Sequence, residues 1–148
     1  MLGLLNSRRM QCLLSAIFHI AASPKAVSGK LLSQKMNLPH RYLEPDMQSL
    51  VQCGILESKR GAGGGYSLAR SPQRISLLDI LQCLASTDTR MDTVEADELQ
   101  RRILQPGLQQ VGADIEALLA NVNLAAWLKQ AEEQGLIAAT RSTPDFCI

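Results

Sequence analysis

A run of glycines flanked by basic residues is the most distinctive part of this 148-residue sequence. Residues 61–65 contain four glycines, with Lys59 and Arg60 before them and Arg70 after them. Glycine lets the backbone adopt positive φ and approach a partner closely. The spacing does not match a nucleotide-binding loop, because Tyr66 stands where the last glycine belongs and no Lys-Ser/Thr pair follows. The segment therefore indicates a basic hairpin that contacts a partner, or a flexible tip whose charges are only solvated.

The residues that could support metal or nucleophilic chemistry do not form such arrangements. The chain has four cysteines, at Cys12, Cys53, Cys83 and Cys147. They are too far apart for zinc-finger or ferredoxin spacings. Cys53 and Cys83 lie in apolar segments, so we expect small buried hydrophobic residues there, with a redox role for Cys53 or Cys147 as the alternative. Neither His19 nor His40 has the partner pattern of a nucleophile and base, so we predict that the protein is not an enzyme.

Charge and composition narrow the class further. Residues 1–76 carry ten Lys/Arg against three Asp/Glu, and residues 77–148 carry five against eleven. Nucleic acid is the usual partner of such a basic half, and two differently solvated surfaces are the alternative. The 46% hydrophobic content excludes a disordered tail. The sequence lacks an apolar membrane-spanning stretch and the features of a signal peptide, so we expect a cytoplasmic protein without a membrane partner.

Helices and a hairpin must position the basic loop. Apolar residues at helical spacing predict a first helix over residues 6–22. Ser28 is expected to cap a short second helix that ends near Met36, with Leu31, Leu32 and Met36 facing inward. After a turn at residues 37–39, a third helix is expected to end at Gly54. Short strands then flank the glycine loop. The expected fold is mainly α with a small β-hairpin, a winged helix-turn-helix.

The second half predicts a long helix of a different kind. A fourth helix should begin after Ser76, and residues 86–96 are polar and acidic, typical of a linker. A narrow apolar stripe at spacings of three and four is then formed by Leu108, Val111, Ile115, Leu118 and Val122. This spacing favours a homodimer helix, with packing within one chain as the alternative. We divide the chain into a DNA-binding domain (1–85), a linker or sensor loop (86–103) and a helical dimerisation region (104–148).

Several segments together resemble one known family. They are Tyr42-Leu43-Glu44, Gly54-Ile55-Leu56, the wing at residues 58–70 and the helix start at residues 75–81. These segments are similar to the Rrf-two (Rrf2) family of winged-helix transcriptional regulators, strongly over residues 13–84 and more weakly at 120–124. The resemblance implies a homodimeric regulator, usually a repressor, on a palindromic operator in double-stranded DNA. Its recognition helix would enter the major groove and its wing the minor groove. An unknown small-molecule effector is a further expected partner.

The resemblance also implies which residues contact DNA. Arg60 matches the wing arginine, which suits a narrow minor groove. Glu44 matches a glutamate that accepts a hydrogen bond from cytosine, and Tyr42 and Ser28 match phosphate contacts. The full predicted set of DNA-contacting residues is Arg8, Arg9, Ser28, Arg41, Tyr42, Glu44, Lys59, Arg60, Gly63, Gly64 and Tyr66.

Two positions depart from the family pattern. Pro45 stands in the recognition helix where many members have glutamine, so either the helix begins later, with Pro45 in its first turn, or it is kinked. The best-known members bind an iron–sulfur cluster through three cysteines, whereas this chain has no cysteine between Leu84 and Phe146. We therefore expect no cluster and no cofactor. Two alternatives are a winged-helix protein that uses its wing for protein contacts, and a thiol-based redox-sensing regulator.

Overall fold

A computed structural model describes residues 2–85 and 97–138 of the chain. The helices are α1 (Leu2–Leu5), α2 (Arg8–Ala21), α3 (Gly29–Met36), α4 (His40–Gln52), α5 (Leu77–Leu84), α6 (Gln105–Ala120) and α7 (Leu124–Glu133), with a 3-10 turn η1 (Pro72–Arg74) and a π-helical turn η2 (Gln100–Leu104). Strands β1 (Leu56–Lys59) and β2 (Gly65–Leu68) form the hairpin. The expected mainly helical fold with one small hairpin is confirmed. The predicted linker at residues 86–96 and Cys147 lie outside the described residues.

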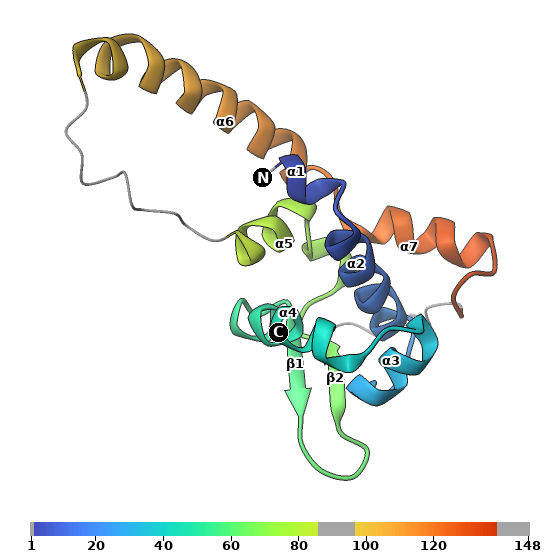
Figure 1. Cartoon of the computed structure of the whole chain (residues 1–148). Coiled ribbons are helices and arrows are strands. Elements are labelled where there is room, and N and C mark those ends of the chain that lie inside the picture. Colours follow the sequence, from blue (N-terminus) through green and yellow to red (C-terminus); the bar gives the residue numbers. More distant parts are fainter. Residues whose placement is uncertain (1, 86–96, 139–148) are drawn as a thin grey trace.

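The long helix α6 stands apart from the other elements. Figure 1 shows α2, α3, α4 and α5 gathered around the base of the hairpin, while α6 extends away from them and the hairpin projects on the other side. Within residues 2–85 and 97–138, no helix is long and apolar enough to cross a membrane.

Residues 10–84 supply most of the hydrophobic core, and α6 and α7 add Leu119, Leu124 and Leu128. Helix α2 contributes Leu13 and Ile17, α4 contributes Leu50, and α5 contributes Ile80, all fully buried. Each such side chain stabilises the fold by about 1.5–3 kcal/mol relative to an exposed one. The helix-turn-helix and the wing therefore share one core.

The first helices differ in detail from the expectation. Instead of one helix over residues 6–22, Ser7 separates α1 from α2, because its hydroxyl accepts a hydrogen bond from Met10 N at 3.1 Å and donates to Leu4 O at 2.6 Å. Ser28 caps α3 as expected, accepting from Leu31 N at 3.1 Å. The inward orientation of Leu31 was wrong: the side chain is 41% exposed, because the short helix buries Leu32 instead.

Helix α4 runs through Pro45. It begins at His40, so Pro45 is its sixth residue, and the expectation that places Pro45 in the first turn is wrong. The helix ends where Gly54 adopts a φ of 70°. There Ile55 N donates to Leu50 O at 3.0 Å and Gly54 N donates to Val51 O at 3.1 Å. This glycine cap turns the chain directly into β1.

The hairpin is attached to the segment before α3. Strands β1 and β2 pair antiparallel, with Lys59 opposite Gly65. Val27 and Tyr66 exchange two backbone hydrogen bonds of 2.8 Å, which form an isolated bridge beside β2. A Cβ on Gly65 would overlap the backbone of Val27 and Ser28, and its φ of 144° is a conformation that L side chains rarely adopt. Gly65 thus allows the wing to lie directly against the start of the helix-turn-helix.

The end of α6 is tied to the start of α5. Ser76 and Asp79 form a capping box at the N-terminus of α5. Leu77 N donates to Val122 O at 2.7 Å, and Leu124 N donates to Ile75 O at 3.1 Å. These bonds hold the base of the long helix against the winged helix-turn-helix.

Candidate nucleic-acid interface

Helix α4 turns a polar face outward. Leu43, Met47 and Leu50 are buried on its inner face. The exposed residues of the outer face are Arg41, Tyr42, Glu44, Pro45 and Gln48. The Arg41 guanidinium lies 5.2 Å from the centre of the Tyr42 ring, and 60% of Tyr42 is exposed. This face offers a cation, a phenol and a carboxylate to a partner without disturbing the core.

Glu44 lies where α4 approaches the wing. Its carboxylate is 3.6 Å from Nδ1 of His40, one turn earlier in the same helix. The pKa of Tyr66 on β2 is raised, first by burial and then by the negative charge of Glu44. Next to this contact, the His40 imidazole occupies the space that a Cβ on Gly29 would fill, so the first turns of α3 and α4 pack closely. The structure therefore brings the predicted residues of α4 and β2 to one side of the molecule.

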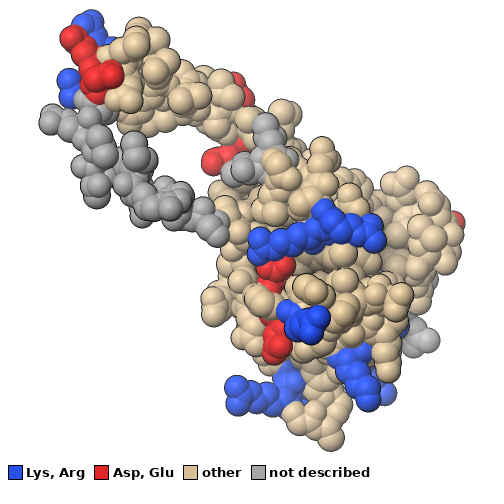
Figure 2. Space-filling model, in the orientation of Figure 1, with Lys and Arg blue, Asp and Glu red and all other residues tan. Residues whose placement is uncertain are grey.

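The wing carries exposed cations at its tip. Lys59 and Arg60 are exposed where β1 ends, and Gly63 is exposed in the turn. Figure 2 shows lysine and arginine side chains on both sides of the hairpin, at the end of the molecule farthest from the long helix. A Cβ on Gly64 would meet the backbone carbonyl oxygens of Lys59 and Gly61, so this turn needs a glycine. The turn at the tip of the wing is therefore compact and flanked by exposed cations.

Arg9 has a structural partner that the sequence reasoning missed. Its Nε donates to Asp46 Oδ2 at 2.9 Å, and its Nη2 donates to Asp46 Oδ1. The hydrogen bond to Asp46 and the charge of that carboxylate raise the pKa of Arg9, while burial lowers it. Asp46 is the one charged side chain that is buried within the described ranges, at 5% exposure. The pair joins α2 to α4, and Arg9 keeps 53% of its side chain exposed. Arg8 is exposed beside it.

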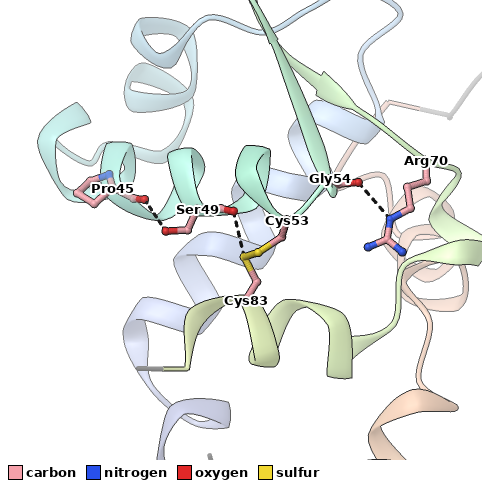
Figure 3. Close-up of a disulfide and its surroundings, with 6 residues drawn as sticks. All are labelled: Pro45, Ser49, Cys53, Gly54, Arg70 and Cys83. Carbon is pink, nitrogen blue, oxygen red and sulfur yellow. Dashed lines mark hydrogen bonds between the residues drawn. A yellow bond between two sulfur atoms is a disulfide. The ribbon is translucent and has the colours of Figure 1, made fainter. Parts of the chain in front are cut away.

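The two cysteines expected to be separate buried residues are bonded to each other. Cys53, which caps the C-terminus of α4, is exposed, and Cys83 in α5 is partly exposed. Their Cα atoms lie 6.1 Å apart and the sulfurs form a disulfide (Figure 3). The expectation of two small buried hydrophobic residues is therefore wrong, since the turn at Gly54 leaves the end of α4 beside α5. Cys12 is free and partly buried.

The predicted dimer residues fall into two groups. Leu108, Val111 and Leu118 are 71%, 55% and 70% exposed. Ile115 and Val122 are partly buried and pack against the core. Two of the five predicted positions thus contribute to the packing of the single chain, and the other three leave an apolar surface along α6.

The donor set does not fit an iron–sulfur cluster. Such clusters are held chiefly by cysteine thiolates. In the structurally described part of the chain, no group of three or more His, Cys, Asp or Glu residues could hold a metal ion. Cys53 and Cys83 bind each other, and no cysteine occurs between Leu84 and Phe146.

Comparison with known proteins gives a consistent family. Residues 6–130 match the family model Rrf2, described as an iron-dependent transcriptional regulator. BadM of Rhodopseudomonas palustris, named as an HTH-type transcriptional regulator, is 33% identical over 122 residues, which cover 80% of this chain and 77% of BadM.

Solved structures agree with this match. The IscR structure from T. potens superposes with a TM-score of 0.63 at 29% identity and covers 93% of this chain and 96% of its own. CymR, titled the global cysteine regulator of B. subtilis, gives a TM-score of 0.60 at 25% identity, covering 84% and 95%.

Proposed function

Since the chain belongs to the Rrf2 family of HTH-type transcriptional regulators, and is a DNA-binding regulator rather than an enzyme, we propose that it acts as a homodimeric repressor on a palindromic operator. One observation carries this proposal: the exposed face of α4 and the basic tip of the wing lie on the same side of the molecule. Such a protein works on chromosomal DNA, so we place it in the cytoplasm.

Helix α4 is the proposed major-groove element. Its exposed Glu44 can accept a hydrogen bond from the amino group of cytosine. Arg41 and Tyr42 would contact phosphates, and the N-terminus of α3 at Ser28 would offer backbone N–H groups to another phosphate. Pro45 offers neither a donor nor an acceptor side chain at the position where many members carry glutamine. Base preference next to the Glu44 contact should therefore differ from that of glutamine-bearing members.

The wing is the proposed minor-groove element. Arg60 precedes a turn with little side-chain bulk, so the hairpin can approach the duplex and place the guanidinium in a narrow groove. Lys59 would contact phosphates, which contributes affinity without sequence preference. The ion pair between Arg9 and Asp46 then acts indirectly, by setting the position of α4 against α2. Arg8 and the exposed part of Arg9 remain proposed phosphate contacts.

The dimer is proposed from the exposed stripe of α6. Leu108, Val111 and Leu118 form an apolar surface that nothing in the described chain covers. A second copy would bury these side chains around a two-fold axis, which matches a palindromic operator. We retain residues 1–85 as the proposed DNA-binding domain, residues 86–103 as a proposed linker or sensor loop, and residues 104–148 as the proposed dimerisation region.

We infer that the regulator works without an iron–sulfur cluster, because its cysteines do not supply the required thiolates. A thiol-based signal is the alternative that the structure favours, because a disulfide joins α4 to α5. A wing used for protein contacts is less well supported, since Lys59 and Arg60 are exposed cations.

Selection of bound fragments from genomic DNA with the purified full chain tests the proposal. We expect enrichment of one palindromic sequence. Affinity for that sequence should fall with salt, with log K decreasing by roughly 0.9 per log unit of salt for each phosphate neutralised. A scrambled duplex of equal composition is the control. Equal affinity for the selected and the scrambled duplex contradicts sequence-specific regulation.

A further inference from the structure

The disulfide joins the end of α4 to the last turn of α5. Cys53 is the residue directly after α4, the proposed recognition helix, and Cys83 lies in the last turn of α5. The bond therefore connects the helix that would read DNA to the helix whose start is hydrogen-bonded to the end of α6. In the reducing surroundings of chromosomal DNA, disulfides are uncommon, and those that form are usually transient or redox-sensing.

We propose that Cys53 and Cys83 form a reversible thiol–disulfide site, and that small thiols and their disulfides control operator affinity through it. This inference rests on the proposed function, because its output is DNA binding. The oxidised protein is the form that binds the operator more tightly.

Exposure makes the pair accessible to a small reagent. Cys53 is exposed, whereas Cys83 is partly covered, so Cys53 is the entry point. The Cys53 thiolate attacks one sulfur of a small-molecule disulfide RSSR, forming the mixed disulfide Cys53–S–S–R and releasing RS⁻. The Cys83 thiolate then attacks the Cys53 sulfur and releases the second RS⁻. The two cysteines lose two electrons and two protons, and RSSR becomes two RSH. Excess RSH reverses both steps.

The reduced state also fits this arrangement. The Cys83 sulfur lies 3.1 Å from the carbonyl oxygen of Ser49, where a Cys83 thiol can donate a hydrogen bond (Figure 3). Ser49 in turn donates its hydroxyl to the carbonyl oxygen of Pro45 at 3.1 Å. A short series of contacts thus leads from the redox site to Pro45 on the outer face of α4. Reduction replaces a covalent bond with one weak hydrogen bond and does not require the core to unpack.

Pro45 makes the second half of α4 dependent on such external contacts. A proline has no backbone N–H, so the helix lacks the bond to the carbonyl of Arg41 in its middle. The second half of α4 is held by its buried Met47 and Leu50, by the ion pair of Asp46 with Arg9 and, at its end, by the glycine cap and the disulfide. A bond at this end restrains the orientation of the whole outer face.

The restraint extends to the dimer helix. From Cys83, α5 leads back to Leu77, whose N–H donates to Val122 O at 2.7 Å at the base of α6. In a dimer built on α6, the disulfide would fix each recognition helix relative to the two-fold axis. Operator half-sites have a fixed spacing, so a fixed separation of the recognition helices favours binding. The oxidised form therefore loses less conformational freedom when it binds the operator, and it should bind more tightly.

The test uses the full chain in glutathione buffers, with the genomically selected duplex as ligand. The parent protein is equilibrated with oxidised or with reduced glutathione, the bond is followed by alkylation and peptide mass mapping, and the duplex is titrated in each state. We expect the oxidised parent to bind at least about fivefold more tightly, the lower end of coupling between linked sites. Cys53→Ser and Cys83→Ser should bind like the reduced parent in both buffers. Cys12→Ser, which alters a cysteine outside the pair, should behave like the parent.

Two kinds of result would contradict the inference, and they can be told apart. If the bond does not form in oxidised glutathione, or if it forms and operator affinity is equal in both states, the redox site is wrong while the proposed function stands. If the parent selects and binds no duplex in either state, the proposed function fails and the switch fails with it. The comparison of the two parent states needs no variant, so poor folding of a serine variant leaves the result interpretable.

Discussion

The winged helix-turn-helix and the long helix α6 handle their apolar residues in opposite ways. In the first region, side chains such as Leu13 and Leu50 are completely buried. In α6, Leu108 and Leu118 have 71% and 70% of their surface exposed. A chain that buries one set so fully does not leave the other exposed for lack of packing capacity. The contrast is what the proposed homodimer requires: most apolar residues of the first region pack within one chain, whereas the exposed stripe of α6 is left for a partner.

The charges show the same contrast in reverse. At the wing, Lys59 and Arg60 are exposed beside glycines that keep the tip narrow. Just before α6, Arg102 in η2 pairs with Glu98 at 2.9 Å. The wing tip therefore leaves its cations exposed, whereas Glu98 offsets the charge of Arg102 locally, as Asp46 does for Arg9 between α2 and α4. One molecule thus carries exposed positive charge at the wing and an exposed apolar stripe along α6.

The largest expected effect comes from placing a charge in the exposed stripe. Leu118→Glu should leave the protomer folded, because the side chain lies outside the core, but should bury two carboxylates in the dimer. We expect dimer affinity to fall by at least about a hundredfold, or about 2.8 kcal/mol. Sedimentation equilibrium measures this change.

Ala113→Glu is the matched control, since it adds the same charge to an exposed position on the opposite side of α6. It should leave the dimer intact. If Leu118→Glu dimerises as strongly as the parent, the exposed stripe is not the dimer interface. The exposure of its apolar residues then no longer supports a partner on α6.

The next effect concerns the wing. Arg60→Ala should weaken operator binding by about 1–3 kcal/mol per subunit and should act most strongly on AT-rich flanking sequence, where the minor groove is narrow. Lys59→Ala is the neighbouring control: it should weaken all duplexes alike and reduce the salt slope. Titration of duplexes that differ only in their flanks separates the two roles. Unchanged operator affinity in Arg60→Ala would favour a wing that contacts protein.

A smaller effect is expected from the buried carboxylate. Asp46→Ala removes the partner of Arg9, whose half-exposed guanidinium can turn to water, so the loss of folding stability should be about 1–2 kcal/mol. Urea unfolding measures it, and Arg9→Ala should lose a similar amount if the pair acts as a unit. Arg8→Ala, at an exposed neighbouring position, should leave the unfolding midpoint unchanged. If Arg8→Ala loses as much folding stability as Asp46→Ala, the ion pair is not responsible for the loss.

The smallest effect is a dependence of folding stability on pH. Burial and the nearby charge of Lys35 lower the pKa of His19 below its usual 6.5. The folded state therefore binds this proton less readily than the unfolded state, so stability is complete above pH 6.5 and decreases as pH falls through the lowered value. His19→Gln should remove this decrease. Urea unfolding midpoints of the parent and of His19→Gln are measured at pH 7.5 and at pH 5.5. If the midpoint falls equally in both proteins between these pH values, His19 is excluded as the cause.

Much of the architecture could be predicted because it depends on local signals. Ser28 and Ser76 cap helices as their positions indicated, and Gly54 ends α4 with positive φ. The glycine run and its flanking strands form the hairpin. Each of these features depends on residues adjacent in sequence, where side-chain chemistry acts directly on the backbone.

The features that were missed depend on residues distant in sequence. The bond between Cys53 and Cys83 spans a separation of 30 residues, and nothing in either segment indicates the other. Asp46 gave a signal that could have been used, because it shares the inner helical face with Leu43 and Leu50, and a buried carboxylate requires a partner. That the partner is Arg9 follows only from the crossing of α2 and α4.

The mass of the protein–operator complex tests the central claim most directly. The full chain is mixed with the duplex selected from genomic DNA, and native mass spectrometry counts the chains bound to each duplex. The account predicts two chains per palindromic duplex, with the complex lost when both half-sites are scrambled. A single chain per duplex, or equal binding to the scrambled duplex, would contradict a dimeric regulator that reads its operator through α4 and the wing.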